Sequence, residues 1–145
     1  LPLPPGVEVG LDVLRQAMGQ LFEGQVSYRA GGGIHAAAIL DVHGRLLVVA
    51  EDVGRHNAVD KATGYCLLRG VPLHDKLLVS TGRASFDMVA KGVRLGLPLL
   101  ASRSSPTSAA VELAQALNCT LIGYLRGNAL NIYTHSWRIF GLIDR

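Results

Sequence analysis

The second half of the chain alternates short apolar runs with helical patterns, and this alternation constrains the fold more than any other feature. Strands are predicted at residues 77–79, 97–101, 119–125 and 131–134, and helices at residues 85–95 and 106–117. Strands that alternate with helices build βαβ units, in which neighbouring strands run parallel. The second half is therefore expected to form the parallel section of an α/β sheet.

The first half adds helices and a hairpin to this sheet. A helix is predicted over residues 8–22, whose apolar face comprises Leu14, Ala17, Met18 and Leu21. Residues 34–42 and 46–50 are β-rich, and His43-Gly44 is predicted to join them as a two-residue hairpin turn. A further helix follows Glu51 and ends at Gly70 and Pro72. The hairpin makes the predicted sheet mixed.

Length and composition limit the class of protein. The 145 residues fit one domain, which we place at residues 8–145, after a proline-rich linker or fragment start at residues 1–7 that lacks an initiator Met. The net charge of +3 is too small for a nucleic-acid-binding surface, and no apolar run is long enough to cross a membrane. Two distant cysteines exclude a disulfide framework and indicate a reduced, cytoplasmic setting.

Three predicted strands are followed by small, hydroxyl-bearing and arginine residues at residues 51–57, 80–85 and 102–107. If the strands are parallel, these junctions share the carboxyl edge of the sheet, where helix N-termini favour anions. Ser105 and Pro106 fit the N-cap and N1 positions of the third helix. Arg55, Arg83 and Arg103 would converge on a phosphate-bearing ligand. For any single junction, ordinary helix caps and solvated arginines explain the pattern equally well.

Several other side chains allow two interpretations. His35 either presents a functional group or packs in its strand, and His56 with Asp60 forms either an acid–base pair or a surface hydrogen bond. Lys61 either contacts phosphate or pairs with Asp60, and Asp87 with Lys91 is predicted to form a surface ion pair. Both cysteines, Cys66 and Cys119, are predicted to be core residues. The sequence shows no P-loop, dinucleotide fingerprint, Cys-x-x-Cys or metal-ligand set.

Five ordered motifs resemble those of the formate dehydrogenase accessory protein family, FdhD. The most specific is Glu-Asp-Val-Gly-Arg-His-Asn-Ala-Val-Asp-Lys at residues 51–61. Others are Gly-Gly-Ile-His-Ala-Ala-Ala at 32–38, Gly-Arg-Ala-Ser-Phe-Asp-Met-Val at 82–89 and Ser-Ser-Pro-Thr at 104–107. The last is Thr-Leu-Ile-Gly-Tyr at 120–124, which leads to Tyr-Thr-His at 133–135. Together they run through nearly the whole chain.

The resemblance implies a sulfurtransferase that takes sulfur from a cysteine desulfurase. The sulfur passes to the bis(molybdopterin guanine dinucleotide) molybdenum cofactor, which the family binds as cargo for formate dehydrogenase. GDP would mimic part of this cofactor. The implied fold is a three-layer α/β/α sandwich with a mixed sheet, similar to cytidine deaminases but without their zinc ligands. The implied assembly is a homodimer, for which the alanine-rich helix at 106–117 is a candidate interface, although a buried helix would look the same.

The junctions and the resemblance together predict a set of cofactor-binding residues. They are His35, Glu51, Asp52, Gly54, Arg55, His56, Lys61, Ser80, Gly82, Arg83, Ser85, Ser102, Ser104, Tyr124, Leu125, Arg126, Gly127, Asn128 and Ala129. No catalytic residue and no metal ligand is predicted in this chain.

The sequence departs from the family at the persulfide cysteines, which the resemblance places on a Cys-x-x-Cys loop just upstream of Leu1. Neither Cys66 nor Cys119 matches those positions. The chain alone is therefore expected to bind the cofactor without transferring sulfur. Two alternatives remain: a non-catalytic chaperone that holds the cofactor, and a metal-dependent hydrolase of deaminase type.

Overall fold

A computed structural model describes residues 1–26 and 33–142 of the chain. Gly32 of the predicted Gly-Gly-Ile-His motif lies outside these residues. The helices are α1 (Leu11–Gly24), α2 (Arg55–Leu68), α3 (Phe86–Arg94) and α4 (Ser108–Ala116). The main strands are β2 (His35–Asp41), β3 (Leu46–Asp52), β4 (Lys76–Ser80), β5 (Leu99–Ser102), β6 (Thr120–Arg126) and β7 (Ala129–Thr134).

The main sheet has six strands in the order β3-β2-β4-β5-β6-β7. Strands β4, β5 and β6 pair in parallel, while β2 pairs antiparallel with both β3 and β4, and β7 pairs antiparallel with β6. The sheet is therefore mixed around a parallel centre, as the alternation of strands and helices predicts. A separate short sheet pairs β1 (Val9–Gly10) with β8 (Ile139–Phe140), which follows the 3-10 turn η2 (Ser136–Arg138).

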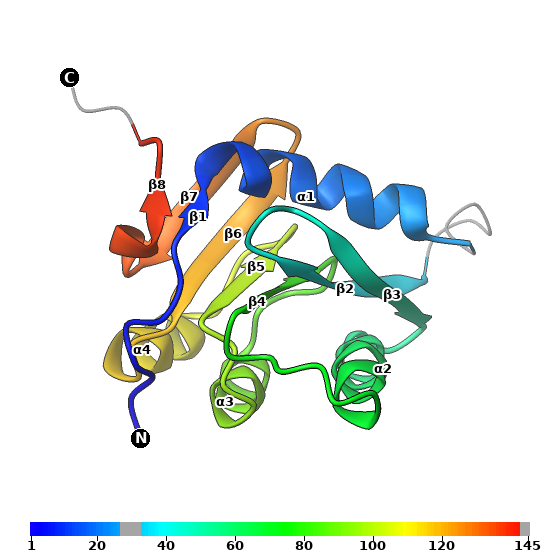
Figure 1. Ribbon diagram of the computed structural model, residues 1–145, viewed down its shortest axis with the longest axis horizontal. Coiled ribbons are helices and arrows are strands. Elements are labelled where there is room, and N and C mark those ends of the chain that lie inside the picture. Colours follow the sequence, from blue (N-terminus) through cyan, green and yellow to red (C-terminus); the bar gives the residue numbers. More distant parts are fainter. Residues whose placement is uncertain (27–32, 143–145) are drawn as a thin grey trace.

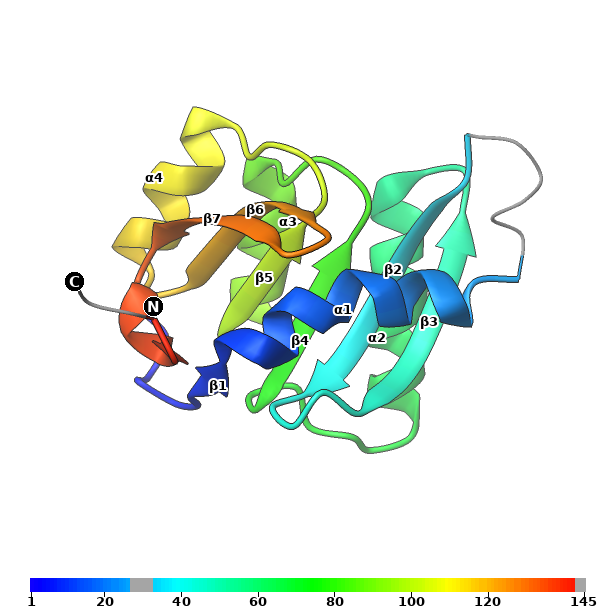
Figure 2. The ribbon, with the colours of Figure 1, turned by 90° about the horizontal axis from the view of Figure 1, so that it is seen from above.

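The sheet is the middle of three layers. Helix α1 crosses one face, and α2, α3 and α4 cover the other (Figures 1 and 2). Side chains alternate between the two cores: in β4, Leu78 packs toward α2–α4, whereas Leu77 and Val79 pack toward α1. The predicted apolar face of α1 is also buried, at Leu14, Ala17, Met18 and Leu21. The three-layer α/β/α sandwich is confirmed.

Two local predictions are wrong. The connection between β2 and β3 spans residues 42–45, because Asp41 Oδ1 accepts hydrogen bonds from the backbone N–H groups of His43 and Arg45 and forms a longer turn. Helix α4 begins at Ser108, because Thr107 caps it by accepting from Ala110 N–H. Ser105 is therefore not its cap, and Pro106 pairs with Ala84 in an isolated bridge.

The opening segment, expected to be a linker or fragment start, packs against the domain. Leu3 is buried, its N–H donates to Leu117 O at 2.8 Å, and its carbonyl accepts from Asn118 Nδ2 at 2.8 Å. The fully buried guanidinium of Arg138 donates to Pro5 O, Pro4 O and Thr120 Oγ1 at 2.9–3.0 Å. Residues 3–5 therefore belong to the folded unit.

None of the helices within residues 1–26 and 33–142 combines the length and the apolar character needed to cross a membrane.

Arg138→Met should lower the free energy of unfolding by about 2–4 kcal/mol, because three hydrogen bonds to a buried charged group are lost together. Urea titration followed by the fluorescence of Trp137, the single tryptophan, measures this change. Arg45→Met is the matched control: Arg45 is exposed in the β2–β3 connection, so its loss should change stability by no more than about 0.5 kcal/mol. Equal stabilities of the two variants would contradict the assigned role of Arg138.

Candidate functional site

The predicted junctions lie at one edge of the sheet. Strands β4, β5 and β6 are parallel, and β3 has the same direction as β4 because both pair antiparallel with β2. Their carboxyl ends, at Asp52, Ser80, Ser102 and Arg126, therefore share this edge with His35 at the amino end of β2. The predicted common edge is confirmed, and it is where open α/β sheets bind ligands.

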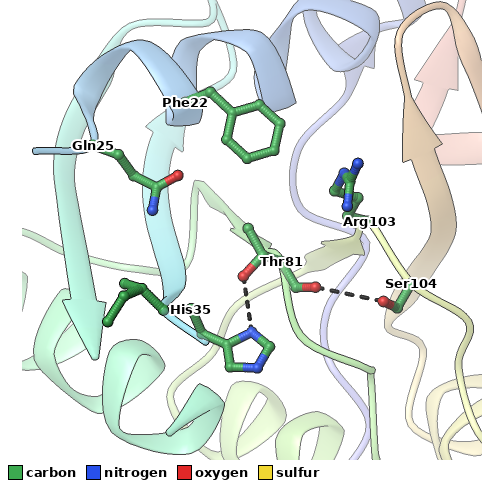
Figure 3. Close-up of a pocket in the computed structure, with 7 residues that line it drawn as sticks. Phe22, Gln25, His35, Thr81, Arg103 and Ser104 are labelled. Carbon is green, nitrogen blue, oxygen red and sulfur yellow. Dashed lines mark hydrogen bonds between the residues drawn. The ribbon is translucent and has the colours of Figure 1, made fainter. Parts of the chain in front are cut away.

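A cavity of about 480 Å³ opens at this edge, a volume within the range of small-molecule sites. It is lined by Phe22, Gln25, Ile34, His35, Thr81, Arg103 and Ser104 (Figure 3). Phe22 and Gln25 come from the end of α1, so the cavity lies between this helix and the second and third junctions. Of the predicted site residues, His35 and Ser104 line it.

The ring of His35 is held by the second junction. Its Nδ1 lies 3.1 Å from Oγ1 of Thr81 (Figure 3). The same hydroxyl accepts from Ala36 N–H at 3.0 Å. Thr81 was not among the predicted site residues, although its position directly after β4 marks it as a hydroxyl at the carboxyl edge.

Ser80 and Ser102 hold the second and third junctions together, Ser102 through its hydroxyl and Ser80 through its backbone carbonyl. Ser102 Oγ donates to Gly82 O at 2.5 Å and accepts from Ser104 N–H at 2.9 Å. Ser80 Oγ accepts from Gly82 N–H at 3.0 Å, and Ser80 O accepts from Arg103 N–H at 3.0 Å. Both serine side chains are buried. These predicted binding residues therefore hold the two loops in place rather than face the cavity.

The first junction is organised around Asp52. One carboxylate oxygen accepts from Gly54 N–H at 3.0 Å, and the other lies 2.8 Å from Lys61 Nζ, which also donates to Glu51 O. The hydrogen bonds from Lys61 and then Gly54 lower the pKa of Asp52 from 3.8 to about 2. Glu51 Oε2 accepts from Val26 N–H. Lys61, predicted to meet phosphate or Asp60, thus pairs with Asp52.

Three predicted carboxylate pairings are replaced by one contact between helices. Asp60 of α2 forms an ion pair with Lys91 of α3. Asp60 therefore neither orients His56, as the acid–base interpretation required, nor pairs with Lys61. Lys91 likewise contacts Asp60 across the helix interface instead of Asp87 on its own helix. Spacing along one helix could not reveal this cross-helix partner.

The three arginines that were predicted to converge have different environments. Arg103 lines the cavity. Arg55 lies against Gly82, where an added Cβ would stand 2.5 Å from Arg55 Cβ and 2.8 Å from its Cδ. Its Nε is buried and has no hydrogen-bond partner among the described residues. Arg83 is exposed beside Gly82. The missing side chain at residue 82 is thus what lets the stem of Arg55 cross the second junction.

A second recess of about 280 Å³ continues from the cavity and shares Phe22 and Arg103 with it. Arg15 and Arg126 also line this recess, with Gly127 and Asn128 of the β6–β7 turn. Arg126 Nε donates to Arg103 O at 3.0 Å, and Arg15 Nε donates to Asn128 O at 3.2 Å. We call the cavity and this recess together the groove. No acidic side chain is among the residues that line it, so the groove favours an anion.

Arg15 is not among the predicted binding residues, because it lies in a helix whereas the prediction concerns the segments that follow strands. The sequence does carry a signal: Arg15, Met18, Gly19 and Phe22 recur at helical spacing, and all four line the second recess. The lack of a side chain at Gly19 leaves open space on this face of the helix, since nothing lies within 4 Å of an added Cβ.

The first turns of the helices, whose N-termini are predicted to favour an anion, do not line the cavity. Residues 81–85 and 103–107 separate β4 and β5 from α3 and α4, so the strand-proximal parts of these loops face the cavity instead. Ser85, a predicted site residue, caps α3 by accepting from Met88 N–H at 3.3 Å.

The remaining predicted residues fall outside the cavity. Gly54 is the N-cap of α2, and His56 lies half-buried in its first turn. Leu125 is a core residue beneath α1, so its side chain lines neither the cavity nor the recess. Tyr124 has a left-handed backbone with φ of 54° and donates its N–H to Ser104 O, while Ala129 is exposed at the start of β7.

Both cysteines are buried, as predicted. Cys66 and Cys119 lie in the core beneath α2–α4. Burial raises the pKa of the Cys66 thiol, and it raises that of Cys119 to about 12. Within residues 1–26 and 33–142, no group of His, Cys, Asp or Glu side chains could hold a metal ion.

The native protein should not react with a thiol reagent at pH 8, because neither thiol is accessible or ionised. Mass spectrometry after iodoacetamide treatment is expected to find Cys66 and Cys119 unmodified without urea and both modified in urea. Rapid modification of either cysteine in the native protein would contradict the burial of that residue.

Asp52 should stabilise the fold in a pH-dependent way. Because its folded pKa of about 2 lies below its ordinary 3.8, the stabilisation is fully present above pH 3.8 and is lost as the pH falls toward 2. The difference in unfolding free energy between the native protein and Asp52→Asn should shrink across this window. Asp87→Asn, at an exposed position of α3, serves as the control and should show a smaller pH dependence.

Comparison with known proteins identifies the relatives of this chain. Residues 2–140 match the model of the FdhD/NarQ family. Sulfur carrier protein FdhD of Nocardia farcinica is 46% identical over 140 residues, which cover 95% of this chain and 50% of the relative. That of Saccharolobus solfataricus is 42% identical over 139 residues, covering 95% and 54%. The chain therefore spans about half the length of these relatives.

Solved structures agree with the family and the fold. A protein from Desulfotalea psychrophila, assigned as a formate dehydrogenase accessory protein, superposes with a TM-score of 0.87 at 33% identity, covering 96% of this chain and 62% of that one. A diaminohydroxyphosphoribosylaminopyrimidine deaminase/5-amino-6-(5-phosphoribosylamino)uracil reductase from Thermotoga maritima superposes with a TM-score of 0.61 at 14% identity, covering 81% of this chain and 38% of that one. This second likeness concerns the fold alone and confirms the expected deaminase-like architecture. Because the family model matches residues 2–140, nearly the whole chain, the chain belongs to the FdhD/NarQ family.

Proposed function

We propose that this chain is the cofactor-recognition part of a sulfur carrier protein that serves formate dehydrogenase. Its groove would bind the phosphate groups of the bis(molybdopterin guanine dinucleotide) molybdenum cofactor. The observation that carries the proposal is the groove lined by Arg15, Arg103 and Arg126, with His35 at its far end and no acidic side chain among its lining residues.

The chemistry of the groove supports a phosphate-bearing ligand. Guanidinium groups bind phosphate oxygens through paired hydrogen bonds, and three of them in one recess favour more than one negative charge. The backbone of Arg103 is also held in place, since its N–H donates to Ser80 O and its carbonyl accepts from Arg126 Nε. Gly127 and Gly19 leave room for a ligand to approach the backbone on both walls.

Sulfur transfer itself is proposed to use residues that this chain does not contribute. A carrier must hold sulfur on an accessible thiolate, whereas Cys66 and Cys119 are both buried. The chain spans about half of its sulfur carrier relatives, so a persulfide site elsewhere in the longer proteins is compatible with the proposal. The proposed partners are a cysteine desulfurase, formate dehydrogenase and a second copy of the chain, and the proposed setting is the cytoplasm.

A non-catalytic chaperone that holds the cofactor would use the same groove, and the burial of both thiols favours it for the isolated chain. The two functions differ in whether sulfur moves. Incubation of the full-length protein with a cysteine desulfurase and cysteine, followed by mass spectrometry, would detect a persulfide on a sulfur carrier and none on a chaperone.

Arg103→Ala should weaken the binding of GDP about tenfold or more, because a charge-assisted hydrogen bond to phosphate is lost. Isothermal titration calorimetry at constant salt measures this, with GDP as a partial mimic of the cofactor. Arg45→Ala is the matched control, since Arg45 is exposed in the β2–β3 connection at the opposite edge of the sheet. Arg83→Ala should have a smaller effect than Arg103→Ala, because Arg83 lies outside the lining of the cavity. Equal GDP affinities of Arg103→Ala and Arg45→Ala would contradict the proposed groove.

A further inference from the structure

Where β4 ends, the side-chain hydroxyl of Thr81 accepts the hydrogen bond that its backbone carbonyl would accept in a regular β-ladder. The ladder between β2 and β4 pairs Ala37 with Ser80, so Ala36 and Thr81 face each other one step further on. Thr81 N–H donates to Ala36 O at 3.0 Å, as a ladder residue would. Ala36 N–H, however, donates to Thr81 Oγ1 at 3.0 Å, and Thr81 O accepts instead from Ser104 Oγ at 3.5 Å (Figure 3).

The hydroxyl of Thr81 has one hydrogen to donate and two candidate acceptors. Nδ1 of His35 is 3.1 Å away, whereas Ala36 O is 3.5 Å away and already accepts from Thr81 N–H. Hydrogen bonds weaken with distance, so the hydroxyl favours Nδ1. A neutral imidazole carries one hydrogen, and a ring that accepts at Nδ1 carries it on Nε2. The shorter of the two distances therefore favours the tautomer of His35 that accepts at Nδ1 and carries its hydrogen on Nε2.

We propose that Thr81 is a positioning residue that presents His35 to the cavity as an Nε2–H donor. The hydroxyl sets both the tautomer and the ring orientation, and its bond from Ala36 N–H anchors it to β2. The identity of the ligand in this inference rests on the proposed function. The group bound beside His35 would be a hydrogen-bond acceptor, such as a phosphate oxygen.

This arrangement would supply the cavity with hydrogen-bond donors from two elements. The guanidinium of Arg103 has donors only, and a His35 ring with its hydrogen on Nε2 would add one more donor. A hydrogen-bond acceptor on the ligand would then be bound from two elements, β2 and the third junction.

The tautomer can be tested without any ligand. Nitrogen-15 NMR of the imidazole rings at pH 8, where histidine side chains are generally neutral, distinguishes protonated from unprotonated ring nitrogens. His35, assigned by comparison with His35→Gln, should show a predominant Nε2–H tautomer in the native protein and in Thr81→Ser. In Thr81→Val the two tautomers should both be populated. A predominant Nδ1–H tautomer in the native protein would overturn the proposal, even if Thr81→Val does not fold.

GDP titrations then test the consequence for binding. Thr81→Ser should bind GDP within about twofold of the native protein, and Thr81→Val about fivefold to tenfold more weakly, as expected for one misoriented hydrogen bond. His35→Gln, whose amide nitrogen stands near the place of Nε2, should retain more affinity than His35→Asn, whose amide nitrogen stands near Nδ1. The reverse order of the two His35 variants would overturn the proposal.

The two sets of experiments separate the two proposals. If the native protein does not bind GDP but His35 shows the Thr81-dependent Nε2–H tautomer, the proposed ligand fails and the positioning role of Thr81 stands. If GDP binds and depends on Arg103 but the tautomer is unaffected by Thr81→Val, the proposed function stands and the positioning role fails.

Discussion

The hydroxyl of Ser102 is the contact on which the rest of the site depends. It donates to the carbonyl of Gly82 and accepts from the N–H of Ser104, so it fastens the loop after β4 to the loop after β5 at a point closed to water. Since hydrogen bonds that water cannot replace are costly to leave unmade, the two loops behave as one rigid unit. Thr81 on one loop and Arg103 on the other are therefore held at a fixed separation before any ligand arrives.

Much of the architecture could be predicted because it follows from local patterns. The alternation of apolar runs and helices in the second half requires a parallel section, and parallel strands bring their following loops to a common edge. The apolar stripe from Leu14 to Leu21 likewise predicts a helix that buries one face. These features depend on spacing along the chain, which the sequence displays directly.

The details of the site could not be predicted, because they depend on contacts between distant segments. Arg15 precedes Arg126 by more than one hundred residues, and only the packing of α1 against the sheet brings both to the same recess. The serines at the ends of β4 and β5 looked suited to a ligand, but the closely spaced loops bury their hydroxyls. Lys91 has an acidic residue one turn away on its own helix, yet it contacts Asp60 of the adjacent helix. In each case the residue type indicates a polar contact, but the sequence does not show which group the side chain contacts.

Gly82 and Arg55 constrain each other during evolution. The aliphatic stem of Arg55 fills the space that a side chain at residue 82 would occupy, and the nearest approach to an added Cβ is 2.5 Å. A mutation at residue 82 alone forces the arginine away, and a shortened side chain at residue 55 alone leaves a void above the second loop. Substitutions at residues 55 and 82 are therefore coupled. Among descendants of this sequence, a change at one position should be accompanied by a compensating change at the other.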